Sequence, residues 1–226
     1  MDAQMEKEYV KGGSFLIEER TASEIFTPED LDEEQRMIGE TTREYVNNEV
    51  RPNLEALEKH DWQLARDLVA KAGELGLLGA NIPEEYGGLE LNQTTGVVVA
   101  ENMGGSSGFG VTYGAQTSIG LLPILYFGSE ELKQKYIPPI ISGEKITAYC
   151  LSEAGSGSDA LGAKCSAKLS EDGTYYTLNG EKMWISNGGF ADSLFRLGLF
   201  EGKIYSGHCF GRKSYGLLFV RSRFGF

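Results

Sequence analysis

The chain of 226 residues has few of the residues that build metal sites and disulfide frameworks. It contains three cysteines and two histidines, and these five residues show no metal-ligand spacing. An odd cysteine count argues against a disulfide scaffold and favours a reducing compartment, so a cytoplasmic location is expected. The sequence has no run of about 18 apolar residues, and its charged N-terminal residues lack the apolar core of a signal peptide. We therefore expect neither a metal site nor a membrane span.

Basic residues are also scarce. The chain has 21 Lys and Arg against 33 Asp and Glu, which gives a net charge of -12. Because nucleic-acid binding depends on surplus positive charge, nucleic acid is not an expected partner. Hydrophobic residues make up 41% of the chain, which is enough to build a core, and its 30 glycines predict many loops and close backbone approaches. The composition favours an acidic globular enzyme of one or two domains.

Helix signals dominate the first 143 residues. Thr27-Pro28-Glu29-Asp30 supplies an N-cap hydroxyl, a proline at the first helical position and acidic residues in the first turn, which predicts a helix from there to about Val50. Apolar residues at spacings of three and four predict a second helix over 62–75. Further helices are predicted over 93–103, over 111–127, and from Ser129 to a break at Pro138-Pro139.

The pattern changes at Lys145 from helical to strand-like. We expect a strand over 146–151, and a hairpin whose arms are 164–169 and 175–178. Asn179-Gly180 then predicts a turn before a strand over 182–186. The expected domains are a loosely ordered arm (1–22), an all-helical domain (23–143) and the start of a β domain (144–192).

Two short segments of the β domain carry polar and aromatic groups. The first is Gly155-Ser156-Gly157-Ser158, where glycines let the backbone approach an anionic group and the N–H and hydroxyl groups can donate hydrogen bonds. It is not a dinucleotide-binding fingerprint, because it leads into a hairpin and not into a helix. An ordinary glycine-serine surface turn has the same pattern.

The second segment contains Trp184 and Ser186, two residues apart on the expected strand. Residues at that spacing share a face, which could cover and hydrogen-bond a flat ring such as an isoalloxazine. A core tryptophan in a sandwich is the alternative. Five such groups on neighbouring strand ends favour a flavin site, and they are Tyr149, Ser152, Ser158, Trp184 and Ser186.

Taken together, the motifs resemble those of the acyl-CoA dehydrogenase family from about Glu29 to Asp192. In addition to the segment 149–159, the resemblance rests on Gly79-Ala80-Asn81-Ile82-Pro83-Glu84-Glu85-Tyr86-Gly87-Gly88, on Gly128-Ser129-Glu130-Glu131-Leu132-Lys133-Gln134-Lys135-Tyr136, and on Asn179-Gly180-Glu181-Lys182-Met183-Trp184-Ile185-Ser186-Asn187-Gly188. It implies an α+β architecture, with a helical N-terminal domain followed by a β-barrel-like middle domain and a C-terminal helical bundle.

The activity that the resemblance implies is FAD-dependent α,β-dehydrogenation of acyl-CoA thioesters, as in fatty-acid β-oxidation. A carboxylate removes the α proton, the β hydride passes to the flavin, and the electrons leave through an electron-transfer flavoprotein. An acyl-CoA oxidase, which passes electrons to oxygen, is an alternative on the same fold.

The resemblance also assigns roles to single residues. Ser152 would bind the polar edge of the flavin, Trp184 would flank its ring, and Ser186 would approach N5. Ser158 would contact the pyrophosphate or the acyl-CoA, and segment 93–127 would form part of the acyl pocket. The family usually has Thr at 152 and 186 and Pro at 154, and the hydroxyls are retained here. The full set of expected FAD contacts is Tyr149, Cys150, Leu151, Ser152, Gly157, Ser158, Trp184, Ile185 and Ser186.

The catalytic glutamate of this family lies in the C-terminal bundle, and no residue of this chain is assigned as the base. Glu153 belongs to the flavin signature and is expected to order its loop. We therefore expect this chain by itself to be inactive. A non-catalytic fragment or pseudogene product with weak flavin binding is the alternative, and homo-oligomers are expected only for a full-length protein.

The tail from about Ser193 differs in charge from the rest, with six basic residues against one acidic residue over 193–226. The resemblance is expected to stop there. One hypothesis is a frameshift, because dropping one nucleotide from codons compatible with 205–216 permits a family-like strand, Thr-Ala-Val-Ile-Ala-Leu-Val-Glu-Lys-Ala-Thr-Gly. Such a tail would leave the barrel incomplete and strand edges unpaired. A genuine divergent tail is the other possibility.

Overall fold

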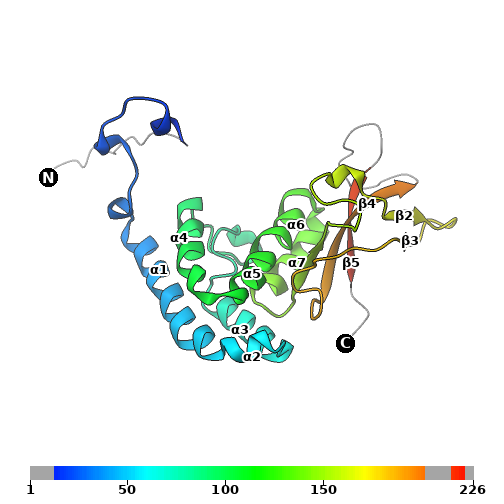
Figure 1. Cartoon of the computed structure of the whole chain (residues 1–226), viewed down its shortest axis with the longest axis horizontal. Helices are drawn as coiled ribbons and strands as arrows, with labels where there is room; N and C mark the ends of the chain where they lie inside the picture. Colours follow the sequence, from blue (N-terminus) through cyan, green and yellow to red (C-terminus); the bar gives the residue numbers. More distant parts are fainter. Residues whose placement is uncertain (1–12, 202–214, 222–226) are drawn as a thin grey trace.

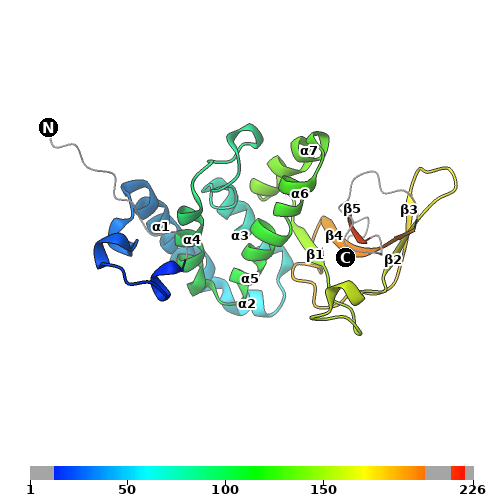
Figure 2. The ribbon, with the colours of Figure 1, turned by 90° about the horizontal axis from the view of Figure 1, so that it is seen from above.

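The computed structural model describes residues 13–201 and 215–221, with side chains described up to Ser193 except that of Phe15. A helical region is followed by a sheet, in the order that the sequence predicts (Figure 1). The view from above shows α6 and α7 beside β1, between the other helices and the rest of the sheet (Figure 2). The helices are α1 (Glu33–Tyr45), α2 (Leu54–Glu58), α3 (Trp62–Glu74), α4 (Gln93–Met103), α5 (Gly108–Gly114), α6 (Leu122–Phe127) and α7 (Glu130–Ile141). The strands are β1 (Thr147–Cys150), β2 (Ser166–Leu169), β3 (Tyr176–Asn179), β4 (Ser193–Glu201) and β5 (Tyr215–Arg221).

The first long helix begins five residues later than the sequence predicts, at Glu33 and not at Pro28. Asp30 accepts a hydrogen bond from the Thr27 amide at 3.0 Å, and this local box closes a 3-10 turn over Pro28–Asp30. Leu31 is then extended, and a second box forms in which Asp32 Oδ1 accepts from the Gln35 amide at 2.7 Å. That second box is the N-cap of α1. A π-helical turn continues the helix over Val46–Val50.

Two other helix predictions are corrected. The stretch 111–127 is not one helix: α5 passes into a π-helical turn over Ala115–Ile119, and α6 begins after it with Pro123 in its first turn. In contrast, α7 does not break at Pro138 and Pro139 but continues to Ile141. Ile137, Ile140 and Ile141 are buried, and their packing holds the last turn although two prolines remove backbone donors.

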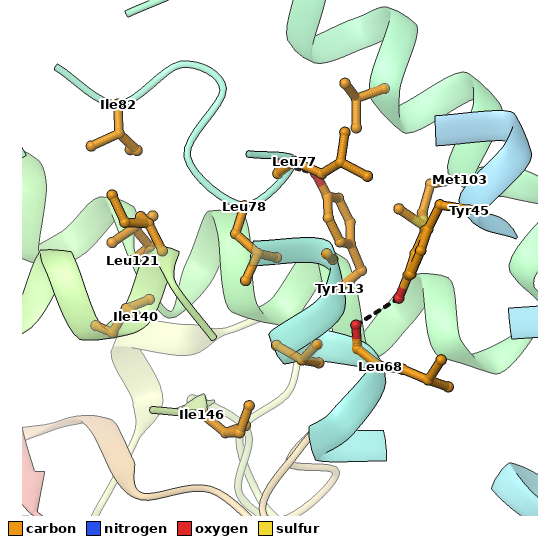
Figure 3. Close-up of a cluster of buried hydrophobic side chains, with 14 of the residues drawn as sticks. Tyr45, Leu68, Leu77, Leu78, Ile82, Met103, Tyr113, Leu121, Ile140 and Ile146 are labelled. Carbon is orange, nitrogen blue, oxygen red and sulfur yellow. Dashed lines mark hydrogen bonds between the residues drawn. The ribbon is translucent and has the colours of Figure 1, made fainter. Parts of the chain in front are cut away.

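One apolar core runs through the helical region to the start of the sheet (Figure 3). Leu121, Ile140 and Ile146 are at most 1% exposed, so the core reaches the residue that precedes β1. Two tyrosines within it satisfy their hydroxyls: Tyr45 donates to Leu68 O at 2.7 Å and Tyr113 donates to Leu77 O at 2.6 Å. Burial raises the pKa of both phenols.

Strand β4 organises the sheet. Its first half pairs in parallel with β1 and its second half in parallel with β2, while β5 pairs antiparallel along its other edge. Strands β2 and β3 form the predicted antiparallel hairpin. The predicted strand over 182–186 is wrong, because these residues form an irregular segment.

Residues 193–226 are predicted to form a divergent tail. In the structure, part of that tail forms β4 and β5, and β4 is paired along both edges. The unpaired edges expected for the tail are thus not found at β4. The frameshift hypothesis stays a prediction, and most of the stretch on which it rests, including His208 and Cys209, lies outside the described residues.

Candidate functional site

The loop that follows β1 is folded into a tight turn. The Glu153 amide donates to Ser156 O at 3.0 Å, and the Ser156 amide donates to Glu153 O at 3.1 Å. Ser156 is buried, and its Oγ donates to Asp159 O at 2.6 Å. Gly157 and Ser158 are exposed. The turn is closed by its own hydrogen bonds, and its outer backbone is open to solvent.

The glycines of this turn are not required by the protein's own packing. A Cβ added at Gly155 or Gly157 would meet nothing within 4 Å, and neither residue has a positive φ. The space that their missing side chains leave is therefore free for a ligand to approach the backbone. An ordinary surface turn has the same open space, so this observation permits a cofactor here but does not distinguish the two readings.

A buried charge pair lies directly behind the turn. Lys182 Nζ is 2.7 Å from Glu153 Oε1 and also donates to Leu151 O at 2.8 Å. Glu153 Oε2 accepts from the Lys164 amide at 2.7 Å, and Oε1 accepts from the Cys165 amide at 2.9 Å. Burial alone would raise the pKa of Glu153, but these hydrogen bonds and the Lys182 charge outweigh it and lower the pKa to about 2. The prediction that Glu153 orders the loop is confirmed.

Trp184 does not lie on a strand, and the predicted shared face with Ser186 is wrong. Its φ of 60° is left-handed, which a strand does not permit, and 86% of the residue is exposed. The alternative of a core tryptophan is therefore also wrong. Because the Met183 amide donates to Ser152 O at 3.0 Å, the segment still runs beside the turn after β1. The exposed Trp184 indole therefore lies next to that turn, where a ligand could stack on it.

Asn187 fixes the far side of the same segment. Its Nδ2 donates to Thr112 O in α5 and to Thr147 O in β1, both at 3.1 Å. Asn187 is buried, its φ is 66°, and its Oδ1 has no hydrogen-bond partner among the described residues. A buried acceptor without a donor is unusual, and a bound group or water would complete it. Asn187 belongs to the family motif over 179–188, but no local sequence signal predicts this role for it.

Arg66 of α3 holds the end of this segment. Its guanidinium donates to Phe190 O at 2.7 Å and to Asp192 Oδ2 at 2.8 Å. The same carboxylate oxygen accepts from the Ile146 amide at 2.8 Å, so it connects the helix to the entrance of β1. The Phe190 ring stacks on Trp62 with centroids 5.1 Å apart. These contacts could not be predicted from local sequence patterns, because they join residues more than 40 positions apart.

An apolar cleft of about 640 Å³ lies in the helical region, between α4, α5 and the loop after α3. Buried Met103 and Tyr113 contribute to its wall, and exposed Tyr126 of α6 also lines it. None of the described residues that line the cleft is acidic. The prediction that segment 93–127 lines a pocket is supported by these residues, while its role as an acyl pocket stays a prediction.

The structure therefore brings the expected site residues into one region, although not on the expected strands. Asn187 connects the Trp184 segment to α5, and α5 lines the cleft. Cys150 is buried, and the remaining expected contacts are half-buried or exposed. Half-buried are Tyr149, Leu151, Ser152, Ile185 and Ser186, and exposed are Gly157, Ser158 and Trp184. Burial, with a smaller contribution from Cys150, raises the pKa of the Tyr149 phenol.

Comparison with known proteins identifies the family. The model of the acyl-CoA dehydrogenase N-terminal domain matches residues 32–144, and the model of the acyl-CoA dehydrogenase middle domain matches residues 148–203. The chain thus belongs to the acyl-CoA dehydrogenase family, and the α+β fold class is confirmed. The middle-domain match continues ten residues past Ser193, so the prediction that the family resemblance stops at about Ser193 is wrong.

Three relatives illustrate the match. A probable acyl-CoA dehydrogenase of Bacillus subtilis is 52% identical over 182 residues, which are 80% of this chain and 31% of the relative. The crystal structure of an acyl-CoA dehydrogenase complexed with FAD from Bacillus anthracis has a TM-score of 0.84 and 47% identity over 94% of this chain and 35% of that one. A structure of the electron transferring flavoprotein of Acidaminococcus fermentans contains a chain with a TM-score of 0.75 and 32% identity, covering 87% of this chain and 50% of that one.

The chain spans about a third of the length of the curated relative and between a third and a half of those two solved chains. Within the described ranges, no helix is both long enough and apolar enough to cross a bilayer. Nor do those ranges hold a cluster of three or more His, Cys, Asp or Glu side chains that could bind a metal ion.

Proposed function

We propose that this chain forms the FAD-binding wall and the acyl-binding cleft of an enzyme that dehydrogenates acyl-CoA thioesters between the α and β carbons. When bound, FAD supplies the two-electron oxidation in such an enzyme. The observation that carries the proposal is the exposed Trp184 indole beside a turn whose glycines leave open space. The Bacillus anthracis relative, which is complexed with FAD, supports the choice of cofactor.

The chain's own groups have separable tasks in this proposal. The open backbone of Gly157 and the hydroxyl of Ser158 bind the pyrophosphate, and Ser152 and Ser186 donate to the polar parts of the ring. Trp184 covers one face of the ring and keeps water from it. The apolar cleft binds the acyl chain, and Tyr126 lies where it can cover that chain.

No described residue serves as the base in this proposal. The cleft is lined without any carboxylate, and Glu153 is already paired with Lys182 and held at a low pKa. The α proton would be removed by a carboxylate that is not among the described residues. We accordingly propose that the chain of 226 residues binds FAD weakly and has no turnover by itself. An electron-transfer flavoprotein as acceptor, a cytoplasmic location and a homo-oligomer of the complete enzyme belong to the same proposal.

The test is a titration of FAD with the purified chain, followed by quenching of flavin fluorescence. The unaltered chain should bind FAD. Trp184→Ala should weaken binding by about tenfold, because a stacked aromatic contact is lost. Gly157→Ala should weaken it similarly by filling the open space, whereas Gly108→Ala, an exposed glycine with equally open surroundings, should not.

An unaltered chain that does not bind FAD, or a Trp184→Ala variant with unchanged affinity, would refute the proposed site. A dye-coupled assay with acyl-CoA tests the second part. We expect no turnover by this chain, and robust turnover would show that a base is present which the structure does not reveal.

A further inference from the structure

The pair of Glu153 and Lys182 differs from the other ion pairs of the protein. Their side chains are 11% and 4% exposed, whereas the other ion pairs in the described part of the chain leave at least 30% of each side chain exposed. Lys59 and Glu55, for example, are 71% and 84% exposed. Burying two charges is costly, and replacing such a pair by apolar groups is often neutral or stabilising. Stability alone therefore does not explain why this pair is buried.

The pair joins the two segments that carry the proposed flavin contacts. Lys182 Nζ reaches Leu151 O and Glu153 Oε1 in the turn after β1. One residue further on, the Met183 amide donates to Ser152 O at 3.0 Å. Three hydrogen bonds thus cross between 151–153 and 182–183, directly beside Ser152 on one segment and Trp184 on the other.

Glu153 adds a third attachment point. Its carboxylate accepts from the amides of Lys164 and Cys165 just before β2, so the turn is also held to the hairpin. At the same end of the hairpin Gly180 lies close to Cys165, where a Cβ would be 2.8 Å from Cys165 Cα, so the backbone that supplies the Cys165 amide is closely packed. The Glu153 carboxylate therefore has three donors, which are two backbone amides beside the hairpin and Lys182 Nζ.

We propose that Glu153 and Lys182 are positioning residues of the flavin site, which set the distance between the turn that binds the pyrophosphate and the segment that carries Trp184. This inference rests on the proposed FAD site. Neither side chain needs to touch the cofactor. A charged pair suits this task because its hydrogen bonds are directional, and a site loses affinity when the residues that support its contacts are loosened.

The test compares Lys182→Met with Lys182→Arg in the full chain, and Lys59→Met serves as the control for loss of an exposed lysine. We expect Lys182→Met to weaken FAD binding by about tenfold or more and to alter the visible circular dichroism of the bound flavin. Lys182→Arg retains donors for both Leu151 O and Glu153, so it should recover most of the affinity. Lys59→Met should bind as the unaltered chain does.

A double variant separates positioning from stability. Lys182→Met leaves the Glu153 charge buried, and adding Glu153→Gln removes that charge, so the double variant should regain unfolding stability. Because the bond to Leu151 O is still missing, its FAD affinity should stay low. If affinity rises together with stability, or if folded Lys182→Met binds FAD as well as the unaltered chain, the positioning role is refuted.

Hydrogen exchange of the chain without FAD tests whether the Glu153–Lys182 pair holds the two segments together, independently of the proposed function. We call the contacts of Lys182 with Glu153 and Leu151 O the brace. In Lys182→Met, the amides of Met183 and Lys164 should exchange at least about tenfold faster, since their bonds to Ser152 O and to the Glu153 carboxylate depend on the brace. Unchanged exchange would refute the brace itself. If the unaltered chain fails to bind FAD while this exchange accelerates, the proposed cofactor site is wrong and the structural brace is not.

Discussion

Gln116 provides the sharpest test of how the sheet is attached to the helices. It is fully buried in the π-helical turn, and its Nε2 donates to Ile140 O at 3.0 Å and to Lys145 O at 2.7 Å. Its Oε1 accepts from the Thr147 amide at 2.8 Å and from Thr147 Oγ1 at 3.1 Å. One side chain thus joins the π-helical turn after α5 to the end of α7 and to the first residue of β1. Gln116→Leu removes all four bonds at similar volume.

The cost can be worked out from the groups that are left behind. Ile140 O keeps a hydrogen bond from the Gly143 amide at 3.1 Å, so its loss is small. The Thr147 hydroxyl can rotate toward another acceptor, so the main cost comes from Lys145 O and the Thr147 amide, and each of these groups left without a partner costs about 1 to 3 kcal/mol. The expected loss is about 2 to 6 kcal/mol, which is a large part of the roughly 5 to 15 kcal/mol typical of a domain.

Urea unfolding followed by far-UV circular dichroism measures this loss. The matched control is Gln134→Leu, an exposed glutamine of α7 that donates to Glu130 at 3.1 Å, and it should change stability by at most about 0.5 kcal/mol. A typical hydrogen bond contributes about 1 kcal/mol. If Gln116→Leu costs less than that, the four-bond junction is not what attaches β1.

Three other predictions concern single residues. The pKa of Glu153 is about 2 in the folded state against an ordinary 4.5, so the stability that its carboxylate contributes is present above pH 4.5 and lost as the pH falls toward 2. Over that range the unaltered chain should lose up to about 3 kcal/mol of unfolding free energy relative to Glu153→Gln. Gly143 has a φ of 77°, and a Cβ there would lie 2.6 Å from Ala70 Cα, so Gly143→Ala should lower the melting temperature and cost about 2 kcal/mol or more. Arg66→Met should speed proteolysis of 184–192 by breaking the bonds to Phe190 O and Asp192.

Each of these three has an outcome that contradicts it. A stability difference between Glu153→Gln and the unaltered chain that does not vary with pH would show that the carboxylate is not held ionised. Gly104→Ala, where the added Cβ meets nothing within 4 Å, should leave stability nearly unchanged, and an equal loss there would remove the steric argument for Gly143. If the Arg66→Met segment is cleaved no faster than in the unaltered chain, other contacts hold it.

Helix positions could be predicted from the sequence where the signals are local. Helix α4 has the predicted bounds, and α3 differs by one residue at its end. Both are predicted well because their caps and apolar spacing are local to each helix. The start of α1 was wrong because Thr27 and Asp32 both begin a capping box five residues apart, and only the second leads into the helix. The continuation of α7 past its prolines depends on burial against other elements, which the local sequence does not contain.

The candidate site could be predicted as a set of residues but not as an arrangement. The residue types after β1 and around Trp184 indicate cofactor chemistry whatever the backbone does. Their geometry depends on contacts that cross long stretches of chain. The Asn179-Gly180 turn signal predicts a strand at Lys182, but the partner of Lys182 is Glu153, 29 positions earlier, and no local pattern indicates that contact. Asn187 likewise acts through carbonyls of α5 and β1.

The central place of β4 determines when the sheet can form during synthesis. Strands β1 and β2 both pair with β4, and in the described part of the sheet they do not pair with each other. The hairpin of β2 and β3 can close as soon as it leaves the ribosome, but β1 has to wait for Ser193 and the residues after it. At about 5 to 20 residues per second, the 43 positions from Cys150 to Ser193 take roughly 2 to 9 seconds. For that time β1 has no partner strand, and its backbone donors and acceptors stay unpaired in the nascent chain.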